Sequence, residues 1–392
     1  MALVDLTQLD SPSDQPFVDL PAGLVDELID NTGAIGSRVL EGFEHLRENR
    51  SALRAGLDDR KILGAEGDLP RAEPATVAAV DGSYAVDRLL TTDLCVCAAV
   101  GVEGLTPPHE SRVWPDPKHR TFVTEESHSE ETATVLRAVM VGYELELAEA
   151  APHSVVMLDG TLALPIIYFN QAFDKAASAP QRKVASCFLE RALPFLEAYE
   201  QMLTSPRSDK YYIGLPKYST KREVGTALAW PAAYDDRGLL SLLLQAGEYT
   251  KPMQLEKPPS PWHLSLKGLD GSQLDRAGEV VERIQAAMSN LWTCYYRPRS
   301  WLPAVRIEMA ASIAGNQQQL ANVLGGVKDQ CAAPGMMEPY PIYMADRMVK
   351  SISTALPAIR QVVTQQACEK YGGDVGEVFF GLHSYRSEAG AA

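Results

Sequence analysis

Residues 76–82 read TVAAVDG, and residues 154–160 read SVVMLDG. Each is a short apolar run that ends in Asp-Gly, a pattern typical of a buried strand followed by a turn. The two acids are Asp81 and Asp159. An Asp at the carboxyl end of a strand in an α/β sheet lies at the edge where functional sites form. The pair therefore predicts an α/β fold with an acidic site at one edge of its sheet.

Further segments complete the predicted order of elements. Strands are expected at 92–102 and 120–126, and residues 131–151 space their apolar side chains as a helix does. The order is then three strands, a helix and a strand, with an acid ending the first and fourth strands. Pro357 should kink or end the last helix of the chain. Farther along, we expect helices near 178–204, 273–290, 312–328 and 339–363, and strands at 211–216, 291–297 and 304–310.

The stretch before the first strand has a different character. Residues 22–62 carry apolar side chains near helical spacing, with charged side chains between them. This pattern predicts a helical arm. Residues 1–20 resemble a loose leader. The sequence therefore predicts three parts: a leader with a helical arm (1–65), the α/β domain (66–375) and a C-terminal tail (376–392).

A helical acid should join the two Asp-Gly acids. Glu144 lies in the helix that precedes the Asp159 strand, and Glu146 is its rival on a different face. The mostly apolar side chains at helical spacing around Glu144 indicate that it points inward, toward the sheet. Glu146 and Glu149 fit the solvated face better.

A fourth acid, Asp346, stands among apolar residues in the last predicted helix, where burying it alone would be costly. The order Asp, Glu, Asp, Asp on strand, helix, strand and final helix is the ribonuclease H plan. Its chemistry is phosphodiester hydrolysis with two divalent ions about 3.5–4 Å apart. Hard carboxylate ligands suit Mg²⁺ or Mn²⁺. The alternative is that the two Asp-Gly pairs are ordinary turns.

The overall charge bears on this hypothesis. The chain has 392 residues, with 51 acids against 36 Lys and Arg and a formal net charge of −15. A free-standing nucleic-acid binder usually has a basic surplus, so charge alone argues against DNA binding. A metal-dependent nuclease remains compatible, because it needs clustered carboxylates and a partner can deliver its substrate. The other interpretation is that the acidity simply keeps the protein in solution.

The six cysteines and the N-terminus indicate the compartment. No two cysteine pairs stand at zinc-binding spacing, so we expect reduced core thiols. The acidic N-terminus lacks a signal sequence, and no apolar stretch reaches membrane-spanning length. We therefore expect a cytoplasmic protein with no membrane contact. The sequence also lacks a phosphate-binding Gly-rich loop, so an ATPase activity would have to come from a partner.

Two basic clusters are secondary candidates. The first follows the 211–216 strand and is suited to gripping a phosphate, although a solvated loop fits it equally well. The second interleaves Arg with aromatic residues in a way that can stack single-stranded bases, and a protein interface fits it as well. The residues are Lys217, Lys221 and Arg222 in the first cluster, and Tyr295, Tyr296, Arg297, Arg299 and Trp301 in the second.

Six segments together resemble the NurA nuclease family, over about residues 75–365. The two Asp-Gly blocks and the Pro-Tyr-Pro block are the most specific of them. The segments are AVDGSYA (79–85), YELELA (143–148), VVMLDGTLALP (155–165), YYIGLPKYST (211–220), VRIEM (305–309) and EPYPIYMADRMVKSI (338–352).

This resemblance implies a ribonuclease H-like mixed sheet flanked by helices, with the helical arm at its N-terminus. It also implies a nuclease that uses Mn²⁺ (or Mg²⁺), two ions, to cut DNA as a 5′–3′ exonuclease and single-strand endonuclease. Its expected partners are a second copy of the chain and a HerA-type hexameric ATPase. The setting would be DNA end processing and repair, or anti-phage defence.

Carried over residue by residue, the resemblance makes Asp81, Glu144 and Asp159 metal ligands. Asp346 stands where the family has His, and it joins them as the fourth catalytic acid. Glu338 stands where the family has Tyr. The substrate contacts expected from the basic cluster and the last block are Lys217, Tyr340 and Arg347.

The replacements at positions 338 and 346 leave two other functions open. One is a catalytically weak or inactive adaptor subunit of a translocase complex. The other is an RNA-cleaving enzyme of the same fold.

Overall fold

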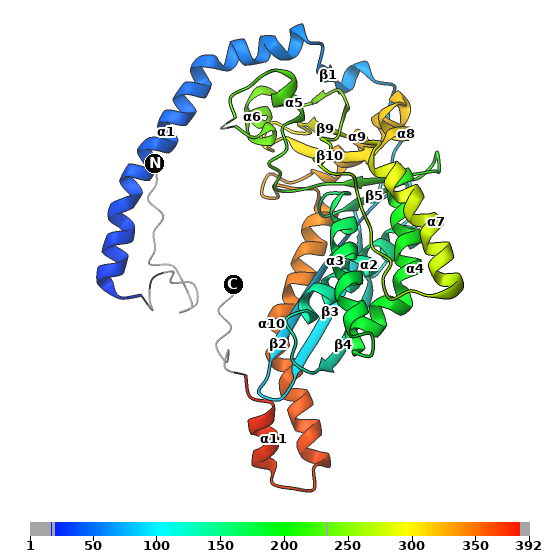
Figure 1. The fold of residues 1–392 in the computed structure, drawn as a ribbon. Coiled ribbons are helices and arrows are strands. Elements are labelled where there is room, and N and C mark those ends of the chain that lie inside the picture. Colours follow the sequence, from blue (N-terminus) through cyan, green and yellow to red (C-terminus); the bar gives the residue numbers. More distant parts are fainter. Residues whose placement is uncertain (1–16, 18–19, 233, 385–392) are drawn as a thin grey trace. The chain divides into compact units, whose positions relative to one another are not determined.

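The computed structural model describes residues 17, 20–232 and 234–384 (Figure 1). The chain forms two compact units, Met1–Arg60 and Lys61–Ala392. Most of the expected leader therefore lies outside the described residues, as do residues 385–392 of the expected tail. The described part of that tail contains most of a short helix, α11 (Val375–Gly381). The three-part division of the sequence stays a prediction.

The first unit contains one long helix, α1 (Ala22–Asp59). Its apolar side chains recur near helical spacing, and many of them are exposed, including Leu28 and Phe43. No described helix in either unit combines the length and the apolar character that a membrane span requires.

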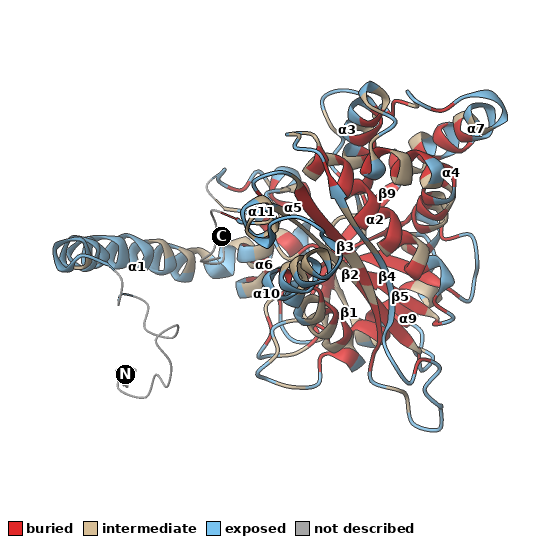
Figure 2. Ribbon diagram, turned by 90° about the horizontal axis from the view of Figure 1, so that it is seen from below, coloured by how far each residue is buried: buried red, intermediate tan, exposed pale blue. Residues whose placement is uncertain are grey.

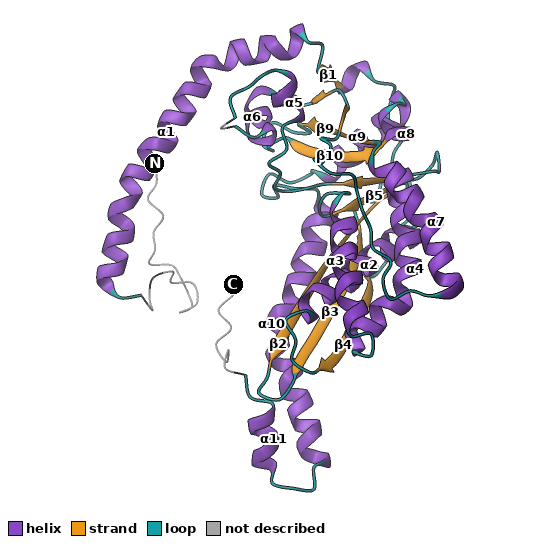
Figure 3. Ribbon diagram, in the orientation of Figure 1, coloured by secondary structure: helices purple, strands orange, loops and turns teal. Residues whose placement is uncertain are grey.

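The second unit is built on one mixed sheet of ten strands within the described residues (Figure 3). Their order is β1-β7-β9-β10-β6-β5-β2-β3-β4, and β8 pairs with β9. The strands are β1 (Leu63–Ala65), β2 (Val77–Arg88), β3 (Asp93–Glu103), β4 (Lys118–Glu126), β5 (Val155–Leu158), β6 (Tyr211–Gly214), β7 (Glu248–Thr250), β8 (Met253–Gln254), β9 (Leu291–Tyr296) and β10 (Val305–Ala310).

The centre of this sheet has the predicted ribonuclease H-like arrangement. β2, β3 and β4 form an antiparallel meander, and β5 and β6 run parallel to β2. The helix between β4 and β5 is α2 (Thr132–Ala150). It is part of the crossover that a parallel strand pair requires. The fold prediction is confirmed, and β10 adds an antiparallel neighbour beyond β6.

Helices cover both faces of the sheet. On β2, Ala78 and Val80 belong to a core with α2, whereas Val77 and Ala79 belong to a second core on the opposite face. Successive side chains of a strand point to opposite faces, and both faces are buried here, which explains the uninterrupted apolar runs. Figure 2 shows this buried interior in red. The helices are α3 (Leu164–Ser178), α4 (Lys183–Thr204), α5 (Glu223–Ala227), α6 (Asp236–Leu243), α7 (Gly271–Met288), α8 (Ala311–Ala314), α9 (Gln317–Gln330) and α10 (Tyr340–Lys370).

Three features differ from the sequence-based expectations. Helix α3 was not expected. Its Pro165 lies in the first turn, where proline is tolerated. Pro357 was expected to kink or end the last helix, and it does not end it, since α10 continues to Lys370. Leu356, and Ile352 and Ile359 on either side, pack against the β2–β3 hairpin and support the helix through the proline.

The third difference is that Asp81 does not end its strand. β2 continues to Arg88, because its pairing with β3 extends along the whole strand. Its parallel pairing with β5, however, ends at Val80 opposite Leu158. Asp81 therefore still lies at the carboxyl end of the parallel part of the sheet.

Candidate active site

Strand parity places the two Asp-Gly acids on the same side of the sheet. Asp81 follows Val77 and Ala79 in the odd register, which faces α9 and the start of α10. Asp159 continues the register of Val155 and Met157, which face the same core. The backbone N–H of Asp159 donates to the carbonyl of Val80, at 3.3 Å. The two carboxylates are therefore neighbours that point the same way.

Asp346 completes the group from α10, which packs against β2 and β3. One carboxylate oxygen each of Asp81, Asp159 and Asp346 lies within 4.8 Å of the others. The side chains of Asp159 and Asp346 are 11% and 17% exposed. Residues far apart along the chain thus meet in one group, called here the acid cluster: Asp81, Glu144, Asp159, Glu338 and Asp346, with Lys217.

Glu144 reaches the acid cluster from α2, on the opposite face of the sheet. It does so beside Gly82, where a Cβ atom would come within 2.6 Å of a Glu144 carboxylate oxygen. A larger residue at this position would therefore force the Glu144 carboxylate to shift. The charges of Asp81 and Asp159 both act on Glu144. The structure therefore places Glu144 beside Asp81 and Asp159, whereas the three carboxylates that lie within 4.8 Å of one another are those of Asp81, Asp159 and Asp346.

Glu146 lies elsewhere and has a different role. Both of its carboxylate oxygens accept hydrogen bonds from Arg191 on α4, at 2.5 and 2.6 Å. Its side chain is 12% exposed, so the expectation of a solvated side chain is wrong. The geometry of the helix points Glu144 toward the sheet and Glu146 toward α4. The pairing of Glu146 with Arg191 could not be predicted from the local sequence pattern.

Lys217 is a cation at the centre of the acid cluster. Its Nζ lies 2.7 Å from Asp159, 3.0 Å from Glu338 and 3.3 Å from Asp346. The loop that follows β6 positions it, and β6 lies directly beside β5. Glu338 was considered in the sequence only as a replacement for Tyr. Its place here depends on the approach of the segment before α10, which no sequence pattern indicated.

Three acids of the cluster, Asp81, Glu144 and Asp159, hold protons more strongly than free carboxyl groups. Burial alone would raise the pKa of Asp346 as well, but the hydrogen bond from Lys350 and the charge of Lys217 bring that pKa below its ordinary value. Burial, together with the charge of Asp159, raises the pKa of Asp81 to about 7. Burial and the charges of Asp81 and Asp159 raise the pKa of Glu144 well above its ordinary value. Burial alone would lower the pKa of Lys217, but its bonds to Asp159 and Glu338 outweigh that effect and raise it. Like charges are thus crowded together with too few cations to offset them.

This geometry fits a divalent metal. Ca²⁺ and Mg²⁺ bind carboxylate oxygens at roughly 2.0–2.6 Å, so one ion can touch three oxygens that lie within 4.8 Å of one another. The donors are all hard oxygens, as Mn²⁺ and Mg²⁺ prefer. A bound cation would also offset the repulsion between these carboxylates, which acts together with burial to raise the pKa values of Asp81 and Glu144. The residues that could hold metal are Asp81, Glu144, Asp159 and Asp346.

The two other predicted substrate contacts lie on α10. Tyr340 is its first residue, two positions after Glu338. Arg347 is exposed, adjacent to Asp346 in sequence, and its guanidinium lies 5.7 Å from the ring centre of Tyr343. Their contact with substrate stays a prediction.

The secondary basic clusters have structural partners instead. Arg222 donates to the carbonyls of Trp230, Pro231 and Tyr234, so it does not grip a phosphate. The proposed base-stacking role of Tyr295 and Tyr296 is wrong, because both are completely buried. The neighbouring Arg297 and Arg299 are also engaged with backbone carbonyls. These bonds connect the segment after β9 to the ends of α6 and α9, and only tertiary packing could reveal such partners.

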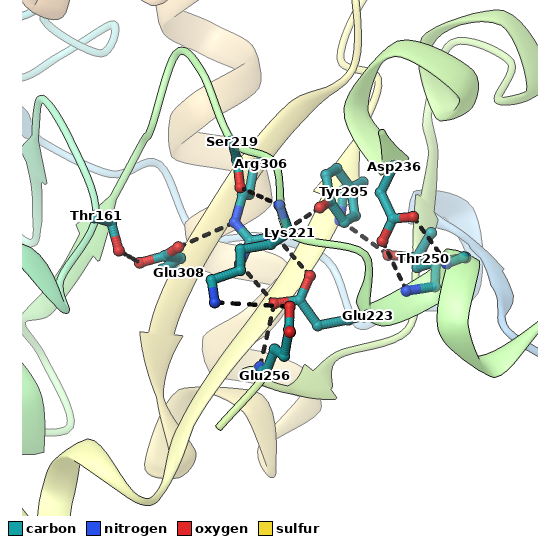
Figure 4. A network of polar contacts seen from close by, with 12 residues as sticks. Thr161, Ser219, Lys221, Glu223, Asp236, Thr250, Glu256, Tyr295, Arg306 and Glu308 are labelled. Carbon is teal, nitrogen blue, oxygen red and sulfur yellow. Dashed lines mark hydrogen bonds and ion pairs between the residues drawn. The ribbon is translucent and has the colours of Figure 1, made fainter. Parts of the chain in front are cut away.

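A buried ion network braces the loop that follows Asp159 (Figure 4). Arg306 and Glu308 lie in β10, and Arg306 donates to Glu308 at 3.0 Å and to Glu223 at 2.7 and 2.8 Å. Glu308 in turn accepts from the Thr161 hydroxyl and from the backbone N–H of Leu162. The sequence reasoning did not assign these residues, although a charged pair inside the apolar strand VRIEM was a visible signal.

The chain matches a family model described as the NurA domain, over residues 75–351. It is also similar in structure to the NurA nuclease of Sulfolobus solfataricus, at 12% identity and a TM-score of 0.58 over 90% of this chain and 99% of that one. A structure of NurA with manganese matches at 12% identity and a TM-score of 0.52, over 88% and 99% of the two chains. No curated protein sequence matches the chain. At these identities the structural likenesses show the fold.

Proposed function

This chain belongs to the NurA family, and on that premise we propose that it is a metal-dependent nuclease that hydrolyses phosphodiester bonds in DNA. The observation that carries the proposal is the acid cluster. Its three closest carboxylates come from β2, the loop after β5 and α10, and they share one small volume. A cluster of mutually repelling acids is costly to fold, so it is expected where metal binding offsets the cost.

Each acid has a distinct part in the proposed reaction. Asp81 lies in β2 and Asp159 directly follows the neighbouring strand β5, and the two would hold a divalent cation together. Glu144, which approaches from the other face, adds the fourth carboxylate that a second ion requires. Bound divalent ions supply a hydroxide nucleophile and offset charge on the leaving oxygen. Asp346 stands in for the family His as an oxygen ligand and narrows the choice toward Mn²⁺ or Mg²⁺.

Lys217 is the residue placed to contact the substrate phosphate. Its ammonium already lies among Asp159, Glu338 and Asp346. When those carboxylates bind a divalent ion instead of Lys217, the same ammonium can donate to a phosphate oxygen without a large movement. Lys is suited to this task because its charge is concentrated and its stem is flexible. Arg347 would add a second, more exposed contact.

The finer features of the proposal come from the family resemblance. They are 5′–3′ exonuclease and single-strand endonuclease activity, two Mn²⁺ or Mg²⁺ ions, a homodimer and a HerA-type ATPase partner. The net charge of −15 supports a partner that delivers DNA, because the chain has no basic surplus to collect it. The setting is DNA end processing or anti-phage defence, in the cytoplasm.

A cleavage assay with purified protein tests the proposal. End-labelled single-stranded DNA, duplex DNA and RNA of one sequence are incubated with Mn²⁺, Mg²⁺ or a chelator, with and without a HerA-type ATPase. We expect cleavage of DNA that needs metal. Asp81→Asn and Asp159→Asn should lose it by roughly a thousandfold or more, since a lost ligand removes several kcal/mol of transition-state stabilisation.

Asp174→Asn is the matched control, because Asp174 is an exposed acid that pairs with Lys267. It should cut as fast as the parent. Cleavage that persists in the chelator, or in the Asp81 and Asp159 variants, would contradict the proposed site. Faster cleavage of RNA than of DNA would support the RNA-cleaving alternative. The absence of both cleavage and carboxylate-dependent Mn²⁺ binding would support the adaptor.

A further inference from the structure

A pocket of about 510 Å³ lies next to the acid cluster, a volume suited to a small-molecule ligand. Three loops line it: the loop after β5, the loop after β6 and the Pro-rich segment after β8. Two of these loops also carry Asp159 and Lys217. Thr161 in the pocket is two residues from Asp159, and Pro216 is adjacent to Lys217. A second, smaller cavity is lined by Glu144 and Asp159 and also has Thr161 and Leu164 in its wall, so the pocket lies beside these two acids.

Large apolar and aromatic side chains line this pocket and are not fully covered. Tyr218 is 94% exposed and Ile167 is 41% exposed. Trp262 is partly buried, and it ends the stretch EKPPSPW, in which three prolines restrict the backbone. An indole ring presented on a stiff segment loses little further freedom when a ligand stacks on it. The pocket is thus suited to binding a ligand with a flat, apolar face.

The charged groups of the pocket are already balanced. Lys221 lies 3.7 Å from Glu256, and Arg306 is fully engaged by Glu223 and Glu308 beneath the pocket (Figure 4). No surplus positive charge is left among these residues to attract a phosphate. The chemistry therefore suits a neutral ligand with a flat face and polar edges.

We propose that this pocket holds one unpaired nucleobase of the DNA strand whose phosphate lies at the acid cluster. The inference rests on the proposed function and deepens it, because it assigns a base-binding subsite to Trp262 and Tyr218. A base has a π-face that stacks on aromatic side chains whatever its identity. The subsite would favour DNA in which the reacting nucleotide is unpaired. It would not favour one base over another.

The experiment compares intact DNA with DNA that lacks one base. Single-stranded substrates carry an abasic nucleotide at each of the first several positions in turn, and kcat/KM is measured with Mn²⁺. At one position the missing base should lower kcat/KM roughly 5- to 150-fold, the range that stacking of one base provides. Trp262→Ala should lower kcat/KM for intact DNA by a comparable factor, and the abasic substrate should then be cut no more slowly than the intact one.

Two variants separate stacking from a structural effect. Trp262→Phe keeps an aromatic face and should keep most of the activity and the abasic penalty. Phe380→Ala removes an exposed aromatic ring that lies outside the pocket, so both quantities should stay as in the parent. Fluorescence of single-stranded DNA with 2-aminopurine at the sensitive position provides a binding readout, with Ca²⁺ in place of Mn²⁺. Its quenching on binding should disappear in Trp262→Ala.

The outcomes distinguish the two proposals. A protein that neither binds nor cuts DNA with any metal removes the proposed function and this inference together. Metal-dependent cleavage with no abasic penalty at any position overturns the base-binding subsite alone. A penalty that persists unchanged in folded Trp262→Ala protein also overturns it, because the sensitive base would then bind elsewhere.

Discussion

The acid cluster and the Arg306 network both bring charged side chains together in largely buried positions. They differ in the balance between negative and positive charges. In the network, Arg306 is 1% exposed, and its donors are shared by Glu223, Glu308 and the Tyr295 hydroxyl. In the acid cluster, five carboxylates meet only two ammonium groups, those of Lys217 and Lys350, among the described residues.

The pKa directions express this difference. Burial alone would raise the pKa of Glu223, but the hydrogen bonds from Arg306 outweigh it and bring the pKa below its ordinary value. The pKa of Asp81 is raised instead, to about 7, by burial and by Asp159. A balanced buried network supports structure, whereas an unbalanced one sacrifices stability and is typical of a functional site. The next three predictions test this contrast.

The largest expected effect is the loss of Arg306. Arg306→Met leaves Glu223 and Glu308 buried without their cation, and breaking a buried pair costs about 3–5 kcal/mol. Urea denaturation should therefore show a large fall in the free energy of unfolding. Arg276→Met is the control, because Arg276 forms an exposed pair with Glu197 and should cost about 1 kcal/mol or less. Equal stability of both variants would contradict a balanced, structural network.

The second prediction concerns the pH dependence of the metal-free protein. The pKa of Asp81 is raised from 3.8 to about 7, so between these pH values the folded protein holds a proton that the unfolded chain has lost. Raising the pH across this window therefore lowers the free energy of unfolding, by up to about 1.4 kcal/mol per pH unit for one proton. The loss is complete above pH 7.

Asp81→Asn should reduce this dependence and be more stable than the parent at pH 8 in a chelator. Denaturation curves at several pH values measure the difference between parent and variant. Asp174→Asn should not reduce it, because the pKa of that exposed acid is lowered by its hydrogen bond to Lys267. A variant that is less stable than the parent at pH 8 would mean that the Asp81 carboxylate has a cation partner in the folded protein.

The smallest expected effect is that of Glu338, the acid that replaces a family Tyr. Glu338→Gln removes one negative charge and leaves Lys217 free to bind Asp159 more closely, in competition with metal. Both changes weaken metal binding, and a partly exposed pair is worth roughly 0.2–1 kcal/mol, or about 1.4- to 5-fold in Kd. Calorimetry with Mn²⁺ measures it, with the exposed Glu131→Gln as control. Tighter Mn²⁺ binding in the Glu338 variant would contradict the role given to Glu338, namely that it supports metal binding.

Local pattern was sufficient for the central fold. The apolar runs 77–80 and 155–158 predict strands. Both faces of these strands are buried, so every residue in each run is apolar and the run can be recognised from the sequence. The amphipathic spacing of α2 likewise indicated Glu144 as the inward acid. The exact end of β2 could not be predicted in this way, because pairing with β3 extends the strand past Asp81. Register along a hairpin depends on a partner strand, not on the strand itself.

The sequence by itself determined the chemistry available: hard carboxylates after two buried strands, a helical acid between them, and an acid in the last helix. Only the tertiary structure decided which of these groups meet. Lys217 and Glu338 join the acid cluster through the packing of β6 and α10, and Trp262 reaches the neighbouring pocket from a Pro-rich loop. The physical reason is the distance along the sequence between the residues that interact. Strand and helix periodicity depends on residues near one another in sequence, whereas the contacts of a site depend on the packing of whole elements.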